Sequence, residues 1–164
     1  MVKSAIRVRL MTPGSLSDVV ADLNRIVCDH SAPHVFVTLA VIQGGRDRTI
    51  DYIVAGHPPI LRIASGTRTI EEIGRSQLAL GIDRESCFEA RSVTCRQGDL
   101  LTLVTDGLLE IFNRHDEEFG LSGLKRELVD CAADRLSEIR DRVQAAALRH
   151  GPQTDDQTTL LVRC

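Results

Sequence analysis

Two acidic segments contain the residues with the clearest chemical potential. Asp106 follows the short apolar run 100–104, and Asp155 and Asp156 directly precede a second apolar, β-rich run that ends at residue 162. Antiparallel strands would bring the end of the first run beside the start of the second. Carboxylates that gather without cysteine or a histidine cluster are the hard oxygen ligands that Mg²⁺ and Mn²⁺ prefer. Paired ions of this kind can acidify a water and neutralise a phosphoryl group, so the pattern indicates a metal-dependent hydrolase.

The same acids have a structural explanation that spacing alone leaves open. Asp106-Gly107 is a common turn sequence, and an Asp at this position could cap the helix that seems to follow in the pattern. Asp155 and Asp156 could belong to a separate turn of the same kind. Residue spacing does not decide between one metal site and two unrelated turns.

A third candidate is His57, which lies in the sequence Ala55-Gly56-His57-Pro58-Pro59. The glycine and the two prolines predict a tight, stiff corner that places an imidazole at the end of a strand. A histidine in a turn is often only exposed or hydrogen-bonded to its neighbours. A catalytic role for His57 is therefore the weaker of two interpretations.

The elements that would position these residues follow a mixed pattern. Apolar residues at three- and four-residue spacing, after a capping serine at 15 or 17, predict a helix that the segment 31–33 ends. A run at 1–10 has helical spacing but no cap, which is typical of the second half of a helix. Further helical segments are predicted at 108–112, 121–129 and 136–148. Strands are predicted at 35–42, 49–54, 60–63, 87–95, 100–104 and in the closing run, with a hairpin turn at 44–47.

Composition excludes several classes of function. The 164 residues suit one domain, and 43% hydrophobic residues can build a sizeable core. A net charge of −3 with scattered basic residues gives no footprint for nucleic acid or an anionic membrane. Aromatic residues make up only 3% of the chain, so there is no stacking platform for single-stranded nucleic acid.

The cysteines and the chain ends indicate a cytoplasmic protein. No apolar segment is long enough to span a bilayer, and the first residues lack the apolar core of a signal peptide. The number of cysteines is odd, and they are far apart, which argues against a disulfide framework and against a zinc site. We expect reduced thiols, mostly buried, at Cys28, Cys87, Cys95, Cys131 and Cys164.

Six short motifs occur in an order that resembles one protein family. That family is the bacterial branch of the metal-dependent protein phosphatases (PPM, or protein phosphatase 2C type), typified by the catalytic domain of sporulation stage II protein E (SpoIIE). The resemblance covers essentially the whole chain. The motifs are Phe36-Val37-Thr38-Leu39, Ala55-Gly56-His57-Pro58-Pro59, Leu80-Gly81-Ile82, Gly98-Asp99 leading to Thr105-Asp106-Gly107-Leu108-Leu109-Glu110, Phe119-Gly120 and Asp155-Asp156-Gln157-Thr158.

The resemblance implies a fold and a set of roles. The fold would be an α+β, α/β/β/α sandwich, with two antiparallel sheets flanked by helices in a single domain over 1–164. Asp106 and Asp155 would be ligands of Mn²⁺ or Mg²⁺, two ions in the complete domain. Asp156 would stand beside the ligands without binding an ion, and His57 would touch phosphate or a water.

The resemblance also implies a substrate class and a signalling context. The activity would be a serine/threonine protein phosphatase that hydrolyses phosphoserine or phosphothreonine. Its partner would be a small phosphorylated regulatory protein of the anti-anti-sigma-factor type, in a sigma factor regulation circuit. A sensor or receiver domain could precede this segment in the parent protein.

The sequence departs from the family at one motif. Nowhere does it contain Asp-x-x-Gly-His-Gly, whose Asp bridges both metal ions in the family. We therefore expect an N-terminally truncated domain that lacks its first strands, in which Asp106 and Asp155 supply ligands to a single ion. Two alternatives follow: a non-catalytic module of the same fold that docks a sigma-factor regulator, and a structural domain with no ligand.

Overall fold

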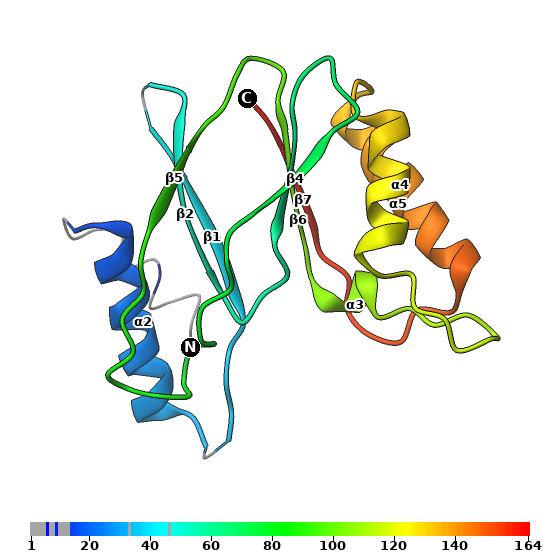
Figure 1. Ribbon diagram of the computed structural model, residues 1–164. Coiled ribbons are helices and arrows are strands. Elements are labelled where there is room, and N and C mark those ends of the chain that lie inside the picture. The colour runs from blue at the N-terminus through cyan, green and yellow to red at the C-terminus, as the bar shows by residue number, and fades with distance from the viewer. Residues whose placement is uncertain (1–5, 7–8, 10–13, 33, 46) are drawn as a thin grey trace. The chain divides into compact units, whose positions relative to one another are not determined.

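The computed structural model describes residue 6, residue 9 and residues 14–32, 34–45 and 47–164 (Figure 1). The chain divides into two compact units. The first comprises Met1–His57 and Gly74–Thr94, and the second comprises Pro58–Ile73 and Cys95–Cys164. Each unit contains one antiparallel sheet and at least one helix, which confirms the predicted α+β class with two antiparallel sheets.

The first unit packs one amphipathic helix on a three-stranded sheet. Helix α2, Leu16–His30, begins at Ser15, whose hydroxyl accepts a hydrogen bond from the Asp18 backbone N–H at 3.2 Å while the Asp18 carboxylate accepts one from the Ser15 N–H at 2.9 Å. This reciprocal pair satisfies two N–H groups that the first turn would otherwise leave unpaired. The sheet has the order β1-β2-β5, with β1 at Leu39–Gly44, β2 at Thr49–Ala55 and β5 at Arg91–Thr94. Their shared core contains Leu16, Val19, Val20, Leu23, Val27, Ile53, Ala55, Leu80 and Phe88.

A buried asparagine fastens a loop of the first unit to α2. Asn24 is fully buried; its Nδ2 donates to the Asp83 carbonyl at 2.9 Å, and its Oδ1 accepts from the Gly81 N–H at 2.9 Å. Leu80 in the same loop exchanges two backbone hydrogen bonds with Val37, at 2.8 and 2.9 Å. The Asn24 side chain thus pairs backbone groups of this loop, as a neighbouring strand pairs those of a sheet edge.

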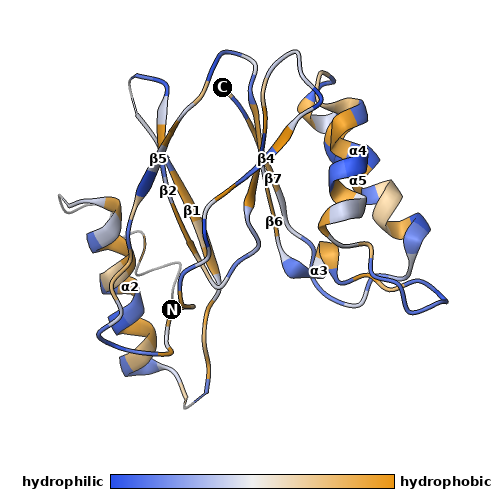
Figure 2. Ribbon diagram, viewed as in Figure 1, coloured by the Kyte–Doolittle hydropathy of each residue, from blue (hydrophilic) through white to orange (hydrophobic). Residues whose placement is uncertain are grey.

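The second unit is a four-stranded sheet covered by helices. The strand order is β4-β3-β6-β7, with β4 at Ile70–Ile73, β3 at Ile60–Ile63, β6 at Leu100–Val104 and β7 at Thr159–Arg163. Helices α3 (Asp106–Leu109), α4 (Gly120–Cys131) and α5 (Leu136–His150) share one apolar cluster with the strands. Figure 2 shows the hydrophobic colour of β6 and the alternating colours of α4 and α5 that amphipathic helices produce.

A buried ion pair fixes the turn that leads into β6. Asp99 is fully buried, and its Oδ2 accepts from Arg62 Nη2 at 2.7 Å and from the Arg96 N–H at 2.9 Å. Its Oδ1 accepts from the Ser65 N–H at 2.9 Å. Burial alone would raise the pKa of Asp99, but these hydrogen bonds and the Arg62 charge outweigh burial and lower the pKa. Asp99 is therefore ionised in the fold and joins β3 to the start of β6.

Most predicted elements are confirmed, because their signals are local. The helix after Ser15 and the strands 49–54, 60–63 and 100–104 lie where they were predicted, to within one residue for the strands. The inner face predicted for the helix at 136–148 is the buried face of α5: Ile139, Val143, Ala146 and Ala147. The helical run predicted at 1–10 lies outside the described residues, apart from residues 6 and 9, which are helical.

Four predictions were wrong at the level of boundaries or exposure. The strand predicted at 35–42 begins only at Leu39, because the preceding residues have no continuous strand partner and form a single bridge to the 78–84 loop. The strand at 87–95 shrinks to β5, where β2 offers pairing for only four residues. The helical turn at 108–112 starts earlier, at Asp106, and β4 was not predicted. Of the five thiols only Cys95 and Cys131 are buried.

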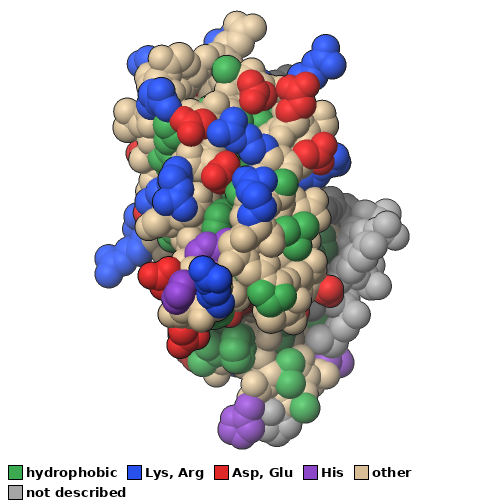
Figure 3. All heavy atoms as spheres, turned by 90° about the vertical axis from the view of Figure 1, so that its right-hand side faces the viewer, with side chains coloured by type: hydrophobic (Ala, Val, Ile, Leu, Met, Phe, Trp, Pro, Cys, Tyr) green, Lys and Arg blue, Asp and Glu red, His purple; other side chains and the backbone are tan. Residues whose placement is uncertain are grey.

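One face of the molecule shows how basic and acidic side chains are distributed on it. On the face that Figure 3 presents, lysine and arginine side chains are intermixed with aspartate and glutamate. Within the described part of the chain, no helix combines the length and the apolar character that crossing a bilayer requires.

Candidate functional site

The pairing of β6 with β7 brings the two acidic segments together. The two strands are antiparallel, with Val104 opposite Thr159, so the end of β6 adjoins the start of β7. Two hydrogen bonds extend this pairing beyond the strands: the Thr105 N–H donates to the Thr158 carbonyl at 3.1 Å, and the Thr158 N–H donates to Thr105 Oγ1 at 2.9 Å. The convergence predicted from the two apolar runs is therefore present in the structure.

A glycine allows these segments to approach each other closely. A Cβ at Gly107 would collide with the backbone carbonyl oxygen of Asp156 and would lie 3.3 Å from the Cβ of Asp155. The first turn of α3 and the Asp155-Asp156 segment are thus in direct contact. Any side chain at residue 107 would push one acidic segment away from the other.

The carboxylates of the site are accessible. Asp106, Asp155 and Asp156 are all exposed. Asp106 Oδ1 accepts from the Gly107 N–H at 3.0 Å, and Asp155 Oδ1 accepts from the Asp156 N–H at 2.7 Å. Each of these two carboxylates keeps its Oδ2 without a hydrogen bond to the described residues. The alternative that Asp106 caps the helix is wrong, because the cap position is Thr105 and Asp106 is the first helical residue.

Two carboxylates, from Asp106 and Asp155, are the metal ligands that the site could offer to a hard cation. Among the described residues no group of three or more histidine, cysteine, aspartate or glutamate side chains could hold a metal ion. Mg²⁺ is commonly held by one or two carboxylates, with waters and a phosphate filling its other positions. Asp106 and Asp155 supply two carboxylates on adjacent segments, and their binding of a Mg²⁺ or Mn²⁺ ion stays a prediction.

Sequence reasoning missed a polar cavity beside the acids. Its volume is about 300 Å³, and it is lined by Leu108, Arg140, Gln144, Gln157, Thr158 and Thr159. Both amide atoms of Gln157 are buried and have no hydrogen-bond partner among the described residues. Gln157 is part of a quoted motif, but no sequence signal connects it with Arg140 and Gln144, which approach it only because α5 packs against the sheet.

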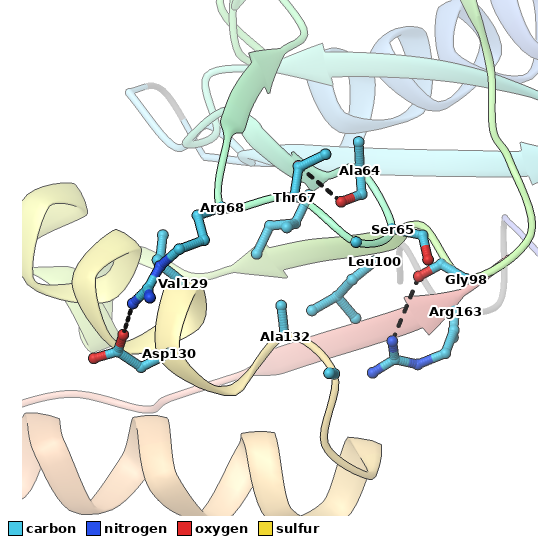
Figure 4. Close-up of a pocket in the computed structure, with 13 residues that line it drawn as sticks. Ala64, Ser65, Thr67, Arg68, Gly98, Leu100, Val129, Asp130, Ala132 and Arg163 are labelled. Atoms are coloured by element: carbon cyan, nitrogen blue, oxygen red, sulfur yellow. Dashed lines mark hydrogen bonds and ion pairs between the residues drawn. The ribbon is translucent and has the colours of Figure 1, made fainter.

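A second cavity of the same unit lies away from the acids (Figure 4). It measures about 250 Å³ and is bounded by the loop after β3, by Gly98 and Leu100 at the start of β6, and by the end of α4. An ion pair between Arg68 and Asp130 crosses its rim, and Arg163 donates to the Gly98 carbonyl at 3.4 Å. Asp106 follows the other end of β6, about 17 Å along a five-residue strand. This cavity is therefore not part of the acidic site.

The third predicted residue belongs to the other unit. His57 is half-buried in the turn after β2, next to Gly56, which adopts a φ of +64° and donates its N–H to the Gln77 carbonyl at 2.8 Å. The predicted tight corner is confirmed. The predicted contact of His57 with phosphate stays a prediction.

Comparison with known proteins assigns the fold and the family. The family model for Stage II sporulation protein E (SpoIIE) matches residues 1–164. The chain belongs to the SpoIIE family. No curated protein sequence matches it. The resemblance drawn from six short motifs is thereby confirmed.

Solved structures of three bacterial proteins share this fold. The SiaA-PP2C domain of Pseudomonas aeruginosa matches with a TM-score of 0.86 at 21% identity, over 99% of this chain and 67% of that one. The PP2C phosphatase domain of SpoIIE from Bacillus subtilis, with a fragment of its regulatory domain, matches with a TM-score of 0.82 at 21% identity, over 99% and 48%. The RsbU and RsbW domains of Rv1364c from Mycobacterium tuberculosis match with a TM-score of 0.80 at 21% identity, over 98% of this chain and 44% of that one. The chain thus spans less than half of the latter two.

Proposed function

We propose that this SpoIIE-family chain is a single phosphatase domain that hydrolyses phosphoserine or phosphothreonine with Mn²⁺ or Mg²⁺. Its substrate would be a small phosphorylated regulator of the anti-anti-sigma-factor type in bacterial signalling. The observation that supports the proposal is the contact between Gly107 and the Asp155-Asp156 segment, which brings together the two segments that carry the candidate ligands Asp106 and Asp155. Family membership over the whole chain supports the same activity.

The structural relatives support the cofactor and the signalling context. A Mn-presoaked phosphatase domain of SpoIIE from Bacillus subtilis matches the chain over 99% of its length, with a TM-score of 0.68 and 21% identity. RsbU and RsbW domains occur in another relative. These names motivate manganese as the first metal to test and a regulatory phosphoprotein as the substrate class.

Each acidic residue of the site would have a distinct role. Asp106 and Asp155 would hold the cation, each through the Oδ2 that accepts no hydrogen bond from the described residues. Asp156 would stand next to them and set the local negative charge that attracts a cation. When bound, the ion would neutralise phosphoryl oxygens and make a water more acidic. The paired strands β6 and β7 flank the segments that carry both ligands, which would limit how far the substrate phosphate can shift.

The test is Mn²⁺-dependent hydrolysis of p-nitrophenyl phosphate. Asp106→Asn should abolish turnover because it removes a ligand charge with almost no change in volume. Asp134→Asn is the matched control: Asp134 is an exposed aspartate of the same unit, between α4 and α5, outside the acidic site. Turnover without added metal, or equal turnover in both variants, would exclude the proposed site. The same assays on a version extended upstream would show whether further ligands are needed.

A second candidate is a non-catalytic module that docks a sigma-factor regulator. It is favoured by the two carboxylates, which fall short of a three-residue metal cluster within the described part of the chain, and by the lack of Asp-x-x-Gly-His-Gly in the sequence. This candidate predicts that the regulator binds equally well to the Asp106→Asn variant and that metal has no effect on the complex. Isothermal titration with and without Mn²⁺ separates the two functions.

A further inference from the structure

The loop that joins α3 to α4 (Figure 1) contains an exposed aromatic side chain, Phe112. Phe112 is 46% exposed, although its neighbours Ile111 and Phe119 are buried at 0% and 4%. A large aromatic side chain facing water beside a polar site is a common anchor for a protein partner.

The loop is rigid because an asparagine organises it. Asn113 Oδ1 accepts from the backbone N–H groups of His115 at 2.8 Å and Glu117 at 3.1 Å, and Asn113 Nδ2 donates to the Glu117 carboxylate at 2.8 Å. Phe112 and Glu118 form an antiparallel bridge, and His150 contacts the Glu117 carbonyl at 2.8 Å. A loop held in this way loses little entropy when a partner binds, so its surface is preorganised.

The loop is also tied to the segment that carries Asp155. The carbonyl oxygen of Phe112 lies so close to Gly151 that a Cβ at residue 151 would collide with it. Three residues lie between Gly151 and Asp155, so their Cα atoms are four steps apart, a span of at most about 14 Å. A standard protein interface covers about 800 Å² on each partner, or about 30 Å across. Phe112 and the candidate ligands therefore fit within one interface.

The charge of the loop indicates what kind of segment it would bind. Glu110, Asp116, Glu117 and Glu118 are exposed, against a single arginine, Arg114. Acidic side chains around an exposed aromatic favour a partner with cationic and apolar residues. Such a partner would reach the acidic site with its phosphate on the metal and its flanking residues on the loop.

We infer that Phe112 and the acidic side chains of the 110–118 loop form a docking surface for the phosphoprotein substrate, and that this surface selects phosphorylated residues flanked by basic and apolar side chains. This inference rests on the proposed phosphatase function. Phe112 acts by positioning the substrate and does not touch the reacting phosphate, so small phosphate esters should not depend on it.

Binding of two synthetic peptides tests the docking surface without requiring turnover. Both carry a non-hydrolysable phosphonate analogue of phosphoserine and a fluorescein label; one has arginine and leucine on each side, and the other has glutamine and alanine. Fluorescence anisotropy with Mn²⁺ should give about tenfold tighter binding of the basic-apolar peptide to the unmodified chain. Phe112→Ala should remove about tenfold of that affinity, and Phe112→Leu should restore most of it. Asp116→Asn with Glu118→Gln should weaken binding more at low salt than at high salt.

A matched control separates docking from general loss of surface hydrophobicity. Leu148 on α5 is 51% exposed, and Leu148→Ala should leave both peptide affinities unchanged. Equal affinity of Phe112→Ala and the unmodified chain for the basic-apolar peptide would overturn the docking surface, even if p-nitrophenyl phosphate hydrolysis proceeds. Lack of Mn²⁺-dependent hydrolysis of that ester by this chain and by an upstream-extended version would instead overturn the phosphatase function. A change in self-association of Phe112→Ala in sedimentation, without a change in peptide affinity, would assign the surface to a second copy and also overturn the inference.

Discussion

Replacement of Gly107 by alanine should separate the two acidic segments and lower both stability and metal affinity. The new Cβ would collide with the Asp156 carbonyl oxygen, a backbone atom that cannot rotate away as a side chain would. Alanine is favoured over glycine by about 1 kcal/mol inside a helix. Forced overpacking costs about 1–3 kcal/mol. The collision therefore equals or outweighs the helix propensity, and we expect a net loss of up to about 2 kcal/mol of unfolding free energy.

The effect on metal binding should be separable from the effect on stability. A cation that binds only the folded state at 100 times its Kd adds about 2.7 kcal/mol of stability, and a tenfold loss of affinity reduces this to about 1.4 kcal/mol. Urea unfolding with and without Mn²⁺ measures both quantities. Circular dichroism is the suitable probe, since the chain has no tryptophan and one tyrosine.

Gly44→Ala is the matched control for this experiment. Its Cβ would meet nothing within 4 Å, so neither stability nor the Mn²⁺ increment should change by more than about 0.5 kcal/mol. If Gly107→Ala is as stable as the unmodified chain and gains the same increment from Mn²⁺, the contact between α3 and the Asp155-Asp156 segment does not position the ligands, and the reasoning is refuted.

Three further predictions concern the fold that supports the site. Asp99→Asn should cost about 3 kcal/mol of unfolding free energy at pH 7, because it leaves Arg62 without its buried partner. The pKa of Asp99 is lowered in the folded state, so the stability that its charge contributes is present above about pH 4 and is lost as pH falls through the folded-state pKa. The urea midpoints of the variant and the parent should therefore converge in acid. Asn24→Ala should cost about 1–3 kcal/mol in the same assay, because it removes the hydrogen bonds to the Asp83 carbonyl and the Gly81 N–H, and a variant of parental stability would contradict this role of Asn24. Exposed Cys87 should react with a maleimide at pH 8 well before Cys95, whose pKa is raised to about 12 by burial and by a hydrogen bond with the Cys164 thiol. Peptide mass spectrometry that finds Cys95 labelled first would show this order to be wrong.

The sequence by itself determined the elements whose signal is local. β6 was predictable because five consecutive apolar or small residues between two turn signals suit a strand that is buried on both faces. α5 was predictable because its four buried residues recur at helical spacing. The family, too, followed from motifs a few residues long, since each motif is a local turn or strand end.

Elements whose limits depend on a partner could not be read from the chain. β4 is the sequence Ile-Glu-Glu-Ile, which lacks an alternating pattern and becomes a strand only because β3 pairs with it. The strand predicted at 87–95 extends only as far as β2 provides hydrogen-bond partners. Pairing between distant segments sets such boundaries, and local propensity does not encode it.

The candidate site likewise combines features that the sequence predicts with features that only the tertiary structure determines. The sequence identified Asp106 and Asp155 as candidates, because Asp106 follows one apolar run and Asp155 precedes another. Their adjacency across 49 residues results from the antiparallel register of β6 and β7, with Val104 opposite Thr159. The close approach at Gly107 and the polar cavity that Arg140 lines arise only when α3 and α5 pack on that sheet. The chemical type of each residue can be read directly from the sequence. Contact between residues that are far apart in the sequence depends on which strands pair and which helices cover them.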